Sequence, residues 1–169
     1  VPYYNKPTQK GQYEYFKAVA EATDKPVIIY NVPGRTGANM EASTCIRLAQ
    51  DVPNIVGIKE ASGKFSQIAD IIAGVPKSFS VLSGDDDITM CMMNAGGSGV
   101  ISVASNAIPE LMVEFVEALG APQVCGADFV SAPDMAKSAE LFYRLRPFFS
   151  ACFVESNPIP VKAALALMG

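Results

Sequence analysis

Lys59 follows a short apolar run, residues 55–58, and precedes a turn of small residues, 61–63. This pattern predicts a buried β-strand that ends at the lysine, with the ammonium group at the mouth of a cavity. Loss of hydration there lowers the pKa of a lysine, and a neutral amine is a nucleophile. The alternative is a structural lysine whose charged end reaches solvent. The spacing alone leaves both open.

Tyr30 and Arg35 stand at the end of the preceding apolar run. That run, residues 26–32, predicts a strand buried on both faces. A tyrosine there can relay a proton, and an arginine placed by the following Pro-Gly turn can hold a carboxylate through two hydrogen bonds. A packing tyrosine and a surface arginine are the alternative. Side chains alternate along a strand, so Glu60 should point away from Lys59, and we interpret it as a structural partner.

Tyr3 and Tyr4 are adjacent at the end of a further predicted strand at the start of the chain. Neighbouring residues of a strand point to opposite faces. One tyrosine could therefore serve the site and the other an interface or a second pocket. Two packing tyrosines are the alternative, and the sequence alone does not separate these cases.

Two other patterns could bind an ion or a phosphate, but each favours a structural role. Residues 83–87 contain three consecutive aspartates, which suit a divalent metal, yet adjacent aspartates point in different directions and suit helix capping better. The glycines of residues 96–102 precede a strand, whereas phosphate-binding loops follow one. We interpret them as a tight helix-to-strand turn. Methionines 90, 92 and 93 are interpreted as packing residues.

Strands and helices must alternate to bring these groups together. Apolar patterns predict strands over residues 26–32, 55–59, 79–83 and 99–104, with helices over 9–23, 41–51, 66–74 and 109–119 and one after the aspartates. This βαβα order is typical of parallel α/β folds, which place their sites at the carboxyl ends of the strands. Only about four such units are present, whereas a closed barrel needs eight.

The pattern changes after Gly120. Residues 121–133 are predicted to form a loop, and a long helix over 133–149 is expected to bend or end near Pro147. A last helix is predicted over residues 158–168, with no strand after it. We interpret this region as a small helical appendage.

Composition excludes several classes of function. The net charge is −4 and no basic block occurs, which argues against nucleic acid as a partner. No apolar run is long enough to span a bilayer, and no signal segment opens the chain. Histidine is absent, which removes the serine and cysteine triads and the commonest zinc ligand. Cys45, Cys91 and Cys152 are expected to be buried free thiols in a reducing cytoplasm. The missing initiator methionine suggests that residues precede Val1 in the natural protein.

Taken together, these motifs resemble the dihydrodipicolinate synthases, within the pyruvate-dependent lyases that include N-acetylneuraminate lyase. YNVPGRTG, GIKEASG, SGDD, GGSGVISV and NPIPVK occur in the family's order and approximate spacing along the whole chain. The resemblance implies an α/β fold: the C-terminal portion of a (β/α)8 TIM barrel, from the end of strand 4 through helix 8, over residues 1–120. It also implies a small C-terminal helical domain over residues 121–169.

The resemblance also implies roles for individual residues. Lys59 matches the lysine that forms a Schiff base with pyruvate, and Tyr30 matches the tyrosine that relays protons. Tyr4 matches the second relay tyrosine, which the family supplies across a dimer interface. The remaining matches concern binding: Arg35 to the carboxylate of aspartate semialdehyde, Gly84 and Ile101 to the pocket around pyruvate, and Tyr3 to the neighbourhood of a lysine-inhibitor pocket.

The implied activity is the condensation of pyruvate with aspartate semialdehyde in lysine (diaminopimelate) biosynthesis, by a homo-oligomer (dimer or tetramer) that needs no metal, nucleotide or flavin. A related lyase acting on another 2-keto acid or on N-acetylneuraminate is the alternative, against which Arg35 argues. A third hypothesis is a fragment that is inactive without the family's first barrel half. That half carries a Gly-Thr-Thr-Gly-Glu loop that completes the proton relay and binds the pyruvate carboxylate.

Overall fold

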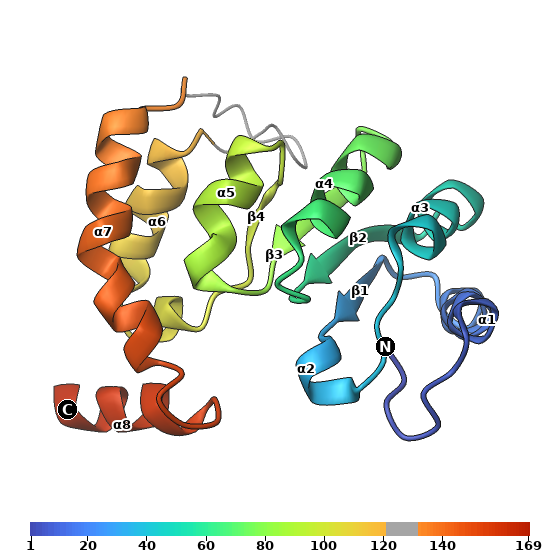
Figure 1. Cartoon of the computed structure of the whole chain (residues 1–169), viewed down its shortest axis with the longest axis horizontal. Helices are drawn as coiled ribbons and strands as arrows, with labels where there is room; N and C mark the ends of the chain where they lie inside the picture. The colour runs from blue at the N-terminus through green and yellow to red at the C-terminus, as the bar shows by residue number, and fades with distance from the viewer. Residues whose placement is uncertain (121–131) are drawn as a thin grey trace. The chain divides into compact units, whose positions relative to one another are not determined.

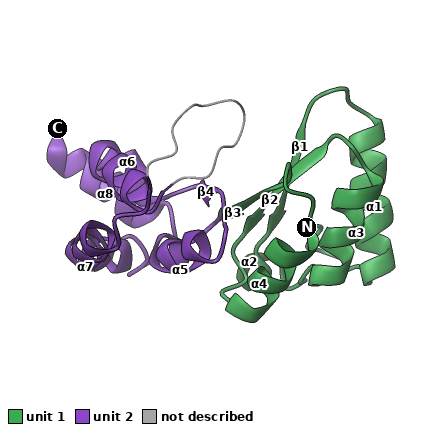
Figure 2. Ribbon diagram, turned by 90° about the horizontal axis from the view of Figure 1, so that it is seen from above, with its two compact units in different colours: residues 1–82 green, residues 83–169 purple. Residues whose placement is uncertain are grey.

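A computed structural model describes residues 1–120 and 132–169 of the chain. Helices and strands alternate from α1 to α6, and the helices α7 and α8 follow (Figure 1). The chain divides into two compact units, residues 1–82 and residues 83–169 (Figure 2). The alternation confirms the predicted α/β class. The expected loop over residues 121–133 lies almost wholly outside the described residues.

The first unit contains a sheet with the strand order β1-β2-β3 and helices on one of its faces. Helix α3 lies between α1 and α4 and contacts β2. The helices and strands predicted over residues 9–83 are confirmed, with differences of one or two residues at their ends. The strand end predicted at Tyr3 and Tyr4 is wrong, because residues 1–8 contain no strand. The elements are α1 (Gln9–Glu21), β1 (Val27–Asn31), α2 (Pro33–Thr36), α3 (Ala42–Asp51), β2 (Ile55–Glu60), α4 (Phe65–Gly74) and β3 (Ser80–Ser83), whose last residue begins the second unit.

Strand β1 is not buried on both faces, contrary to the prediction. Ile29 and Asn31 are fully buried, whereas Ile28 is 48% exposed and Tyr30 is 38% exposed. Side chains alternate between the two faces of a strand. The helices of the first unit cover one face, and its described residues leave the other face open at Ile28 and Tyr30. The apolar run therefore predicted the strand but not the exposure of its second face.

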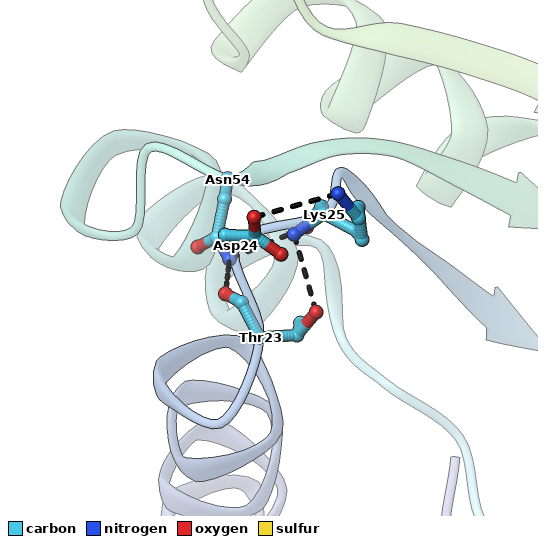
Figure 3. A network of polar contacts seen from close by, with 4 residues as sticks. All are labelled: Thr23, Asp24, Lys25 and Asn54. Atoms are coloured by element: carbon cyan, nitrogen blue, oxygen red, sulfur yellow. Dashed lines mark hydrogen bonds and ion pairs between the residues drawn. The ribbon is translucent and has the colours of Figure 1, made fainter.

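The amino ends of β1 and β2 are joined by Asn54, which precedes β2. Its Nδ2 donates to the carbonyls of Ala20, at 2.8 Å, and Thr23, at 3.1 Å. The Val27 N–H in turn donates to the Asn54 carbonyl at 2.7 Å. We call these contacts the amino-end clamp, and Figure 3 shows the part of it formed by Asn54 and Thr23, where the Lys25 N–H also donates to the Thr23 hydroxyl. The strands then pair in parallel, with a register shift between Val27 and Ile28.

The second unit is mainly helical. Helix α6 packs beside α7 (Figure 1), and α5 contacts both η1 and β4. The strand predicted over residues 99–104 is shorter than expected, because the Val103 and Ala104 N–H groups donate to the Asp86 carboxylate instead of to a neighbouring strand. The elements are η1 (Asp86–Ile88), α5 (Thr89–Asn94), β4 (Gly99–Val100), η2 (Ala104–Asn106), α6 (Pro109–Ala118), α7 (Met135–Ala151) and α8 (Ile159–Met168).

Helix α7 does not end near Pro147 but continues to Ala151. A proline inside a helix removes one backbone hydrogen bond. Leu141, Leu145 and Phe149 recur every fourth residue and are all buried, so packing offsets that loss. The prediction of a long helix is confirmed, and of the two alternatives at Pro147 the end is wrong, while the bend stays a prediction.

The methionines and glycines near α5 have the structural roles predicted for them. Met92 is fully buried, and Met93, which is 6% exposed, belongs to the core cluster against which Met90 packs. Gly96 and Gly99 have φ values of 105° and 146°, a region that side chains rarely adopt. The tight turn between α5 and β4 is therefore confirmed.

The three described cysteines are free, but only two are buried. Cys45 and Cys152 are buried as predicted, whereas Cys91 is exposed, contrary to the prediction. Met92 and Met93 turn toward the core from α5, and Cys91 beside them points outward. Cys125 lies outside the described residues.

We expect alkylation to separate these thiols in the native protein. Burial, with a smaller contribution from the charge of Glu60, raises the pKa of the Cys45 thiol to about 12, so thiolate is scarce there. Iodoacetamide at neutral pH should modify Cys91 rapidly and Cys45 only after unfolding, as read by peptide mass. Rapid native modification of Cys45 would contradict the described packing of α3.

Candidate active site

Tyr30 and Lys59 face each other at the carboxyl ends of neighbouring strands. They are cross-strand partners in the parallel pairing of β1 with β2. The Lys59 Nζ lies 4.4 Å from the centroid of the Tyr30 ring, within the range of a cation–π contact. We call these two residues the strand-end pair. The two residues predicted to act together from separate strand ends are thus brought together.

Glu60 points to the opposite face, as predicted, and is fully buried. It is the cross-strand partner of Asn31, whose Nδ2 lies 3.0 Å from Glu60 Oε2 and 3.3 Å from Oε1. The Ser62 N–H donates to Oε1 at 2.6 Å and fixes the turn that follows β2. Glu60 is therefore a structural partner at the strand ends, as the alternation of side chains indicated.

Two further amides extend this contact. Gln67 Nε2, from α4, donates to Glu60 Oε2 at 3.2 Å, and Asn39 Nδ2 donates to Gln67 Oε1 at 2.8 Å. Asn31 Nδ2 also donates to Asn39 Oδ1 at 3.0 Å. The sequence pattern gives no prediction for these amides. The one signal available is Asn31 itself, a polar residue in an apolar run, on the same buried face of the strand as Ile29.

Arg35 lies on α2, the short helix that directly follows β1. Pro33 begins the helix, and Gly37 ends it with a φ of 66° in the left-handed region. The Thr36 hydroxyl donates to the Val32 carbonyl at 3.1 Å and ties the helix back to the strand end. Arg35 is exposed, and its backbone position is fixed by this short connection.

Tyr3 and Tyr4 belong to the segment that lies beside Tyr30. The amino group of Val1 donates to the Tyr30 carbonyl at 2.8 Å. Tyr3 is 70% exposed and Tyr4 is 86% exposed. With Tyr15 and Phe16 of α1, the first five residues line a cavity of about 420 Å³. The two tyrosines are therefore available at the surface of the first unit rather than packed in its core.

Gly84 and Ile101 belong to the second unit, where each follows a strand. The Ile101 N–H donates to the Ser83 carbonyl at 2.8 Å, which joins the ends of β3 and β4. The Ser83 hydroxyl donates to the Asp85 carbonyl at 2.7 Å, and this closes a tight turn at Gly84. Ile101 is 40% exposed. These two predicted pocket residues therefore lie at neighbouring strand ends within one unit.

The aspartates after β3 have the capping role that the sequence favoured. Asp85 Oδ1 accepts from the Asp87 N–H at 3.1 Å and caps η1. Asp86 is buried and accepts from two N–H groups at the start of η2. Within residues 1–120 and 132–169, no group of three acidic, cysteine or histidine side chains could hold a metal ion.

We expect Asp85→Asn to stabilise the protein at neutral pH. Burial raises the pKa of the Asp85 carboxyl above its ordinary 3.8, against the opposing hydrogen bond from the Asp87 N–H. The folded chain then binds this proton more tightly than the unfolded chain, so the free energy of unfolding falls as pH rises from 3.8 through the folded pKa. Asparagine caps equally well and carries no charge.

Urea titrations of both proteins at several pH values measure this effect. The advantage of Asp85→Asn should be present near neutral pH and disappear as the pH falls below 3.8. An advantage that does not depend on pH would contradict the assignment to the Asp85 charge.

Comparison with known proteins bears on the site as a whole. The sequence model described as the Dihydrodipicolinate synthetase family matches residues 1–169. The chain is 51% identical over 168 residues to the 4-hydroxy-tetrahydrodipicolinate synthase of Koribacter versatilis, covering 99% of this chain and 52% of that protein. The chain therefore spans about half the length of this curated relative.

Solved structures agree with this comparison. Dihydrodipicolinate synthase from Thermotoga maritima superposes with a TM-score of 0.89 at 47% identity, over 100% of this chain and 55% of that one. The chloride inhibited dihydrodipicolinate synthase from Acinetobacter baumannii, complexed with pyruvate, superposes with a TM-score of 0.89 at 41% identity. It is matched over 100% of this chain and 54% of its own. At these identities the likeness extends from fold to sequence.

Proposed function

The chain belongs to the dihydrodipicolinate synthetase family, and on this premise we propose that it carries the imine-forming site of a 4-hydroxy-tetrahydrodipicolinate synthase. This enzyme would condense pyruvate with aspartate semialdehyde in lysine biosynthesis. The observation that carries the proposal is the strand-end pair, with the Lys59 amine 4.4 Å from the Tyr30 ring centroid. An amine and a phenol at neighbouring strand ends supply the nucleophile and the proton relay of Schiff-base chemistry.

The proposed reaction begins when the Lys59 amine attacks the ketone carbon of pyruvate and water leaves. The resulting imine nitrogen is positive and withdraws electrons, so a methyl proton is lost and an enamine forms. The enamine carbon adds to the aldehyde carbon of aspartate semialdehyde, and the aldehyde oxygen becomes a hydroxyl. The amino group of the substrate then attacks the imine carbon, closes the ring and releases Lys59, for a net loss of one water.

The other predicted residues have supporting roles in this proposal. Tyr30 relays protons with Tyr4, whose exposure suits a residue supplied to a second subunit. The exposed Arg35 holds the carboxylate of aspartate semialdehyde through two hydrogen bonds. Gly84 and Ile101 line the pyruvate pocket, and Tyr3 adjoins a pocket for lysine as an inhibitor.

Borohydride trapping tests the proposal directly. Incubation of the 169-residue chain with pyruvate and sodium borohydride should leave a stable secondary amine on the peptide that contains Lys59, as read by mass spectrometry. Lys59→Arg keeps the charge but has no attacking amine and should show no adduct. An adduct on another lysine would refute the assignment of Lys59, whereas absence of any adduct in the wild-type chain would favour a fragment that is inactive without the family's first barrel half.

A related lyase for other 2-keto acids or for N-acetylneuraminate is the competing function. The curated relative described above favours the synthase, and so does Arg35, which suits a carboxylate substrate. Parallel assays of aspartate semialdehyde consumption and of pyruvate release from keto-sugar acids separate the two. Release of pyruvate without consumption of aspartate semialdehyde would favour the alternative.

We also propose that the protein works as a homo-oligomer, a dimer or a tetramer, in the cytoplasm. Tyr3, Tyr4 and Ile28 expose large apolar surfaces of the first unit, and such surfaces usually mark interfaces. The free thiols suit a reducing compartment. No helix of the described residues is long and apolar enough to cross a membrane. Sedimentation should detect association, and a monodisperse monomer of 17.9 kDa would contradict it.

The domain division expected from the sequence belongs to this proposal too. Residues 1–120 would be part of a (β/α)8 barrel, and residues 121–169, part of which lie outside the described residues, would form a C-terminal helical domain. The α/β likeness to the solved synthases supports the barrel assignment. The boundary itself stays a prediction.

A further inference from the structure

A closed ring of polar side chains lies on the far side of the β1–β2 pair from the strand-end pair. We propose that this ring, called here the polar frame, positions the Lys59 amine over the Tyr30 ring. The proposal rests on the proposed function for the chemistry of the strand-end pair, whereas the positioning can be tested without that chemistry. The polar frame consists of Asn31, Asn39, Glu60 and Gln67.

The hydrogen bonds of the polar frame leave no mismatch of donors and acceptors. Asn31 Nδ2 donates to both Glu60 and Asn39, while Gln67 receives from Asn39 and donates to Glu60. Asn31 Oδ1 accepts from the Met40 N–H at 3.0 Å, so the acceptor atom of this amide also has a partner. Each amide therefore has one allowed orientation. A network of this kind fixes geometry more sharply than apolar packing does.

Stability alone does not account for a carboxylate in this place. Glu60 is fully buried, and its hydrogen bonds come from neutral donors. Burying a charge is unfavourable, and apolar replacements of buried charged groups are often at least as stable. A role in specifying one arrangement of the strands explains why a carboxylate is buried at Glu60.

The register of the strands shows which arrangement is specified. The amino-end clamp at Asn54 (Figure 3) lies before the register shift between Val27 and Ile28, so it does not by itself set the pairing at the carboxyl ends. Along the two strands, the cross-strand pair Asn31–Glu60 comes directly after the strand-end pair. A slip by one residue would send every side chain to the other face. It would break both pairs at once, so the polar frame holds the register that the strand-end pair needs.

The same frame anchors the chain that returns from α2. The Asn39 carbonyl accepts from Gln9 Nε2 at 2.9 Å and Gln12 Nε2 at 3.1 Å, both on α1. The backbone at Met40 is held by Asn31. Since α2 carries Arg35 between β1 and this anchored segment, the frame also limits where Arg35 can lie.

Glu60→Gln is the principal test variant. The NH₂ group of the new amide would face the NH₂ group of Gln67, so two donors would meet. Rotating Gln67, Asn39 and Asn31 in turn would only move this clash of donors along the ring, until the Asn31 amide group faced the Met40 N–H. Gln67→Met is a milder second variant at a half-buried position. The double variant Glu60→Gln with Gln67→Glu restores one acceptor for each donor. Glu155→Gln removes an exposed carboxylate and serves as the matched control.

The measurement is the NMR chemical shift of the Lys59 Hε protons in protein labelled with ¹³C-lysine. The Lys59 signal is assigned as the one that Lys59→Arg removes. Protons above an aromatic ring resonate upfield, so the wild-type signal should lie upfield of the other lysines. Glu60→Gln should lose most of this displacement, Gln67→Met part of it, and the double variant should regain it. The control should match the wild type. Circular dichroism establishes that each variant is folded.

Two outcomes would overturn the proposal. One is a folded Glu60→Gln or Gln67→Met variant whose Lys59 signal stays at the wild-type position. The other is unfolding of both variants, since the frame would then support the whole unit rather than the strand-end pair. Borohydride trapping on another lysine in the wild type would refute the proposed function instead. It would leave the NMR result as a separate statement about geometry.

Discussion

Tyr30→Phe should slow the reaction of Lys59 with pyruvate by a factor of roughly 10² to 10⁴, the usual contribution of a positioned proton donor or acceptor. The variant keeps the aromatic ring that lies 4.4 Å from the Lys59 Nζ, so the cation–π contact survives. Only the hydroxyl is lost. Because Tyr30 is 38% exposed, the free energy of unfolding should change by less than about 0.5 kcal/mol.

The rate of borohydride-trapped adduct formation at Lys59 measures this effect over a time course. Tyr143→Phe is the matched control, because Tyr143 is 71% exposed on α7. In this variant, the adduct at Lys59 should form at the wild-type rate. The NMR position of Lys59 should be unchanged in Tyr30→Phe, which separates loss of proton transfer from loss of positioning. A wild-type rate in Tyr30→Phe would remove Tyr30 from the proton relay.

The strand-end pair could be predicted from the sequence because it depends on short-range patterns. An apolar run that ends in Lys59 places the lysine at a strand end, and alternation alone sends Glu60 to the opposite face. Parallel strands end at a common edge, so Tyr30 was expected near Lys59. The structure adds the register that makes them direct partners.

The polar frame could not be predicted in the same way. Its amides come from a strand, a loop and a helix, so the pattern of no single element brings Asn39 to Gln67. The shortened β4 has a similar cause, because the Asp86 carboxylate takes two N–H groups that a strand would have used. Long-range hydrogen bonds of this kind are invisible to local periodicity. The exposure of Cys91 likewise depends on which face of α5 meets the core.

Phe115→Ala should destabilise the second unit by about 3–5 kcal/mol, the usual cost of removing a buried phenylalanine. Phe115 is fully buried, and its ring lies 6.3 Å from that of Phe142 and 6.2 Å from that of Phe149, measured between centroids. Its removal leaves a cavity between α6 and α7. Phe153→Ala, at a 46% exposed position, is the matched control and should change the free energy of unfolding far less.

Hydrogen exchange in Phe115→Ala also tests the boundary predicted between residues 120 and 121. The core around Phe115 contains residues from both sides of it, Met112 on α6 and Leu145 on α7 among them. Because the two helices share this core, their amides should lose protection together. If α7 kept its protection while α6 lost it, the C-terminal helices would form a separate cooperative unit, as an independent helical domain requires.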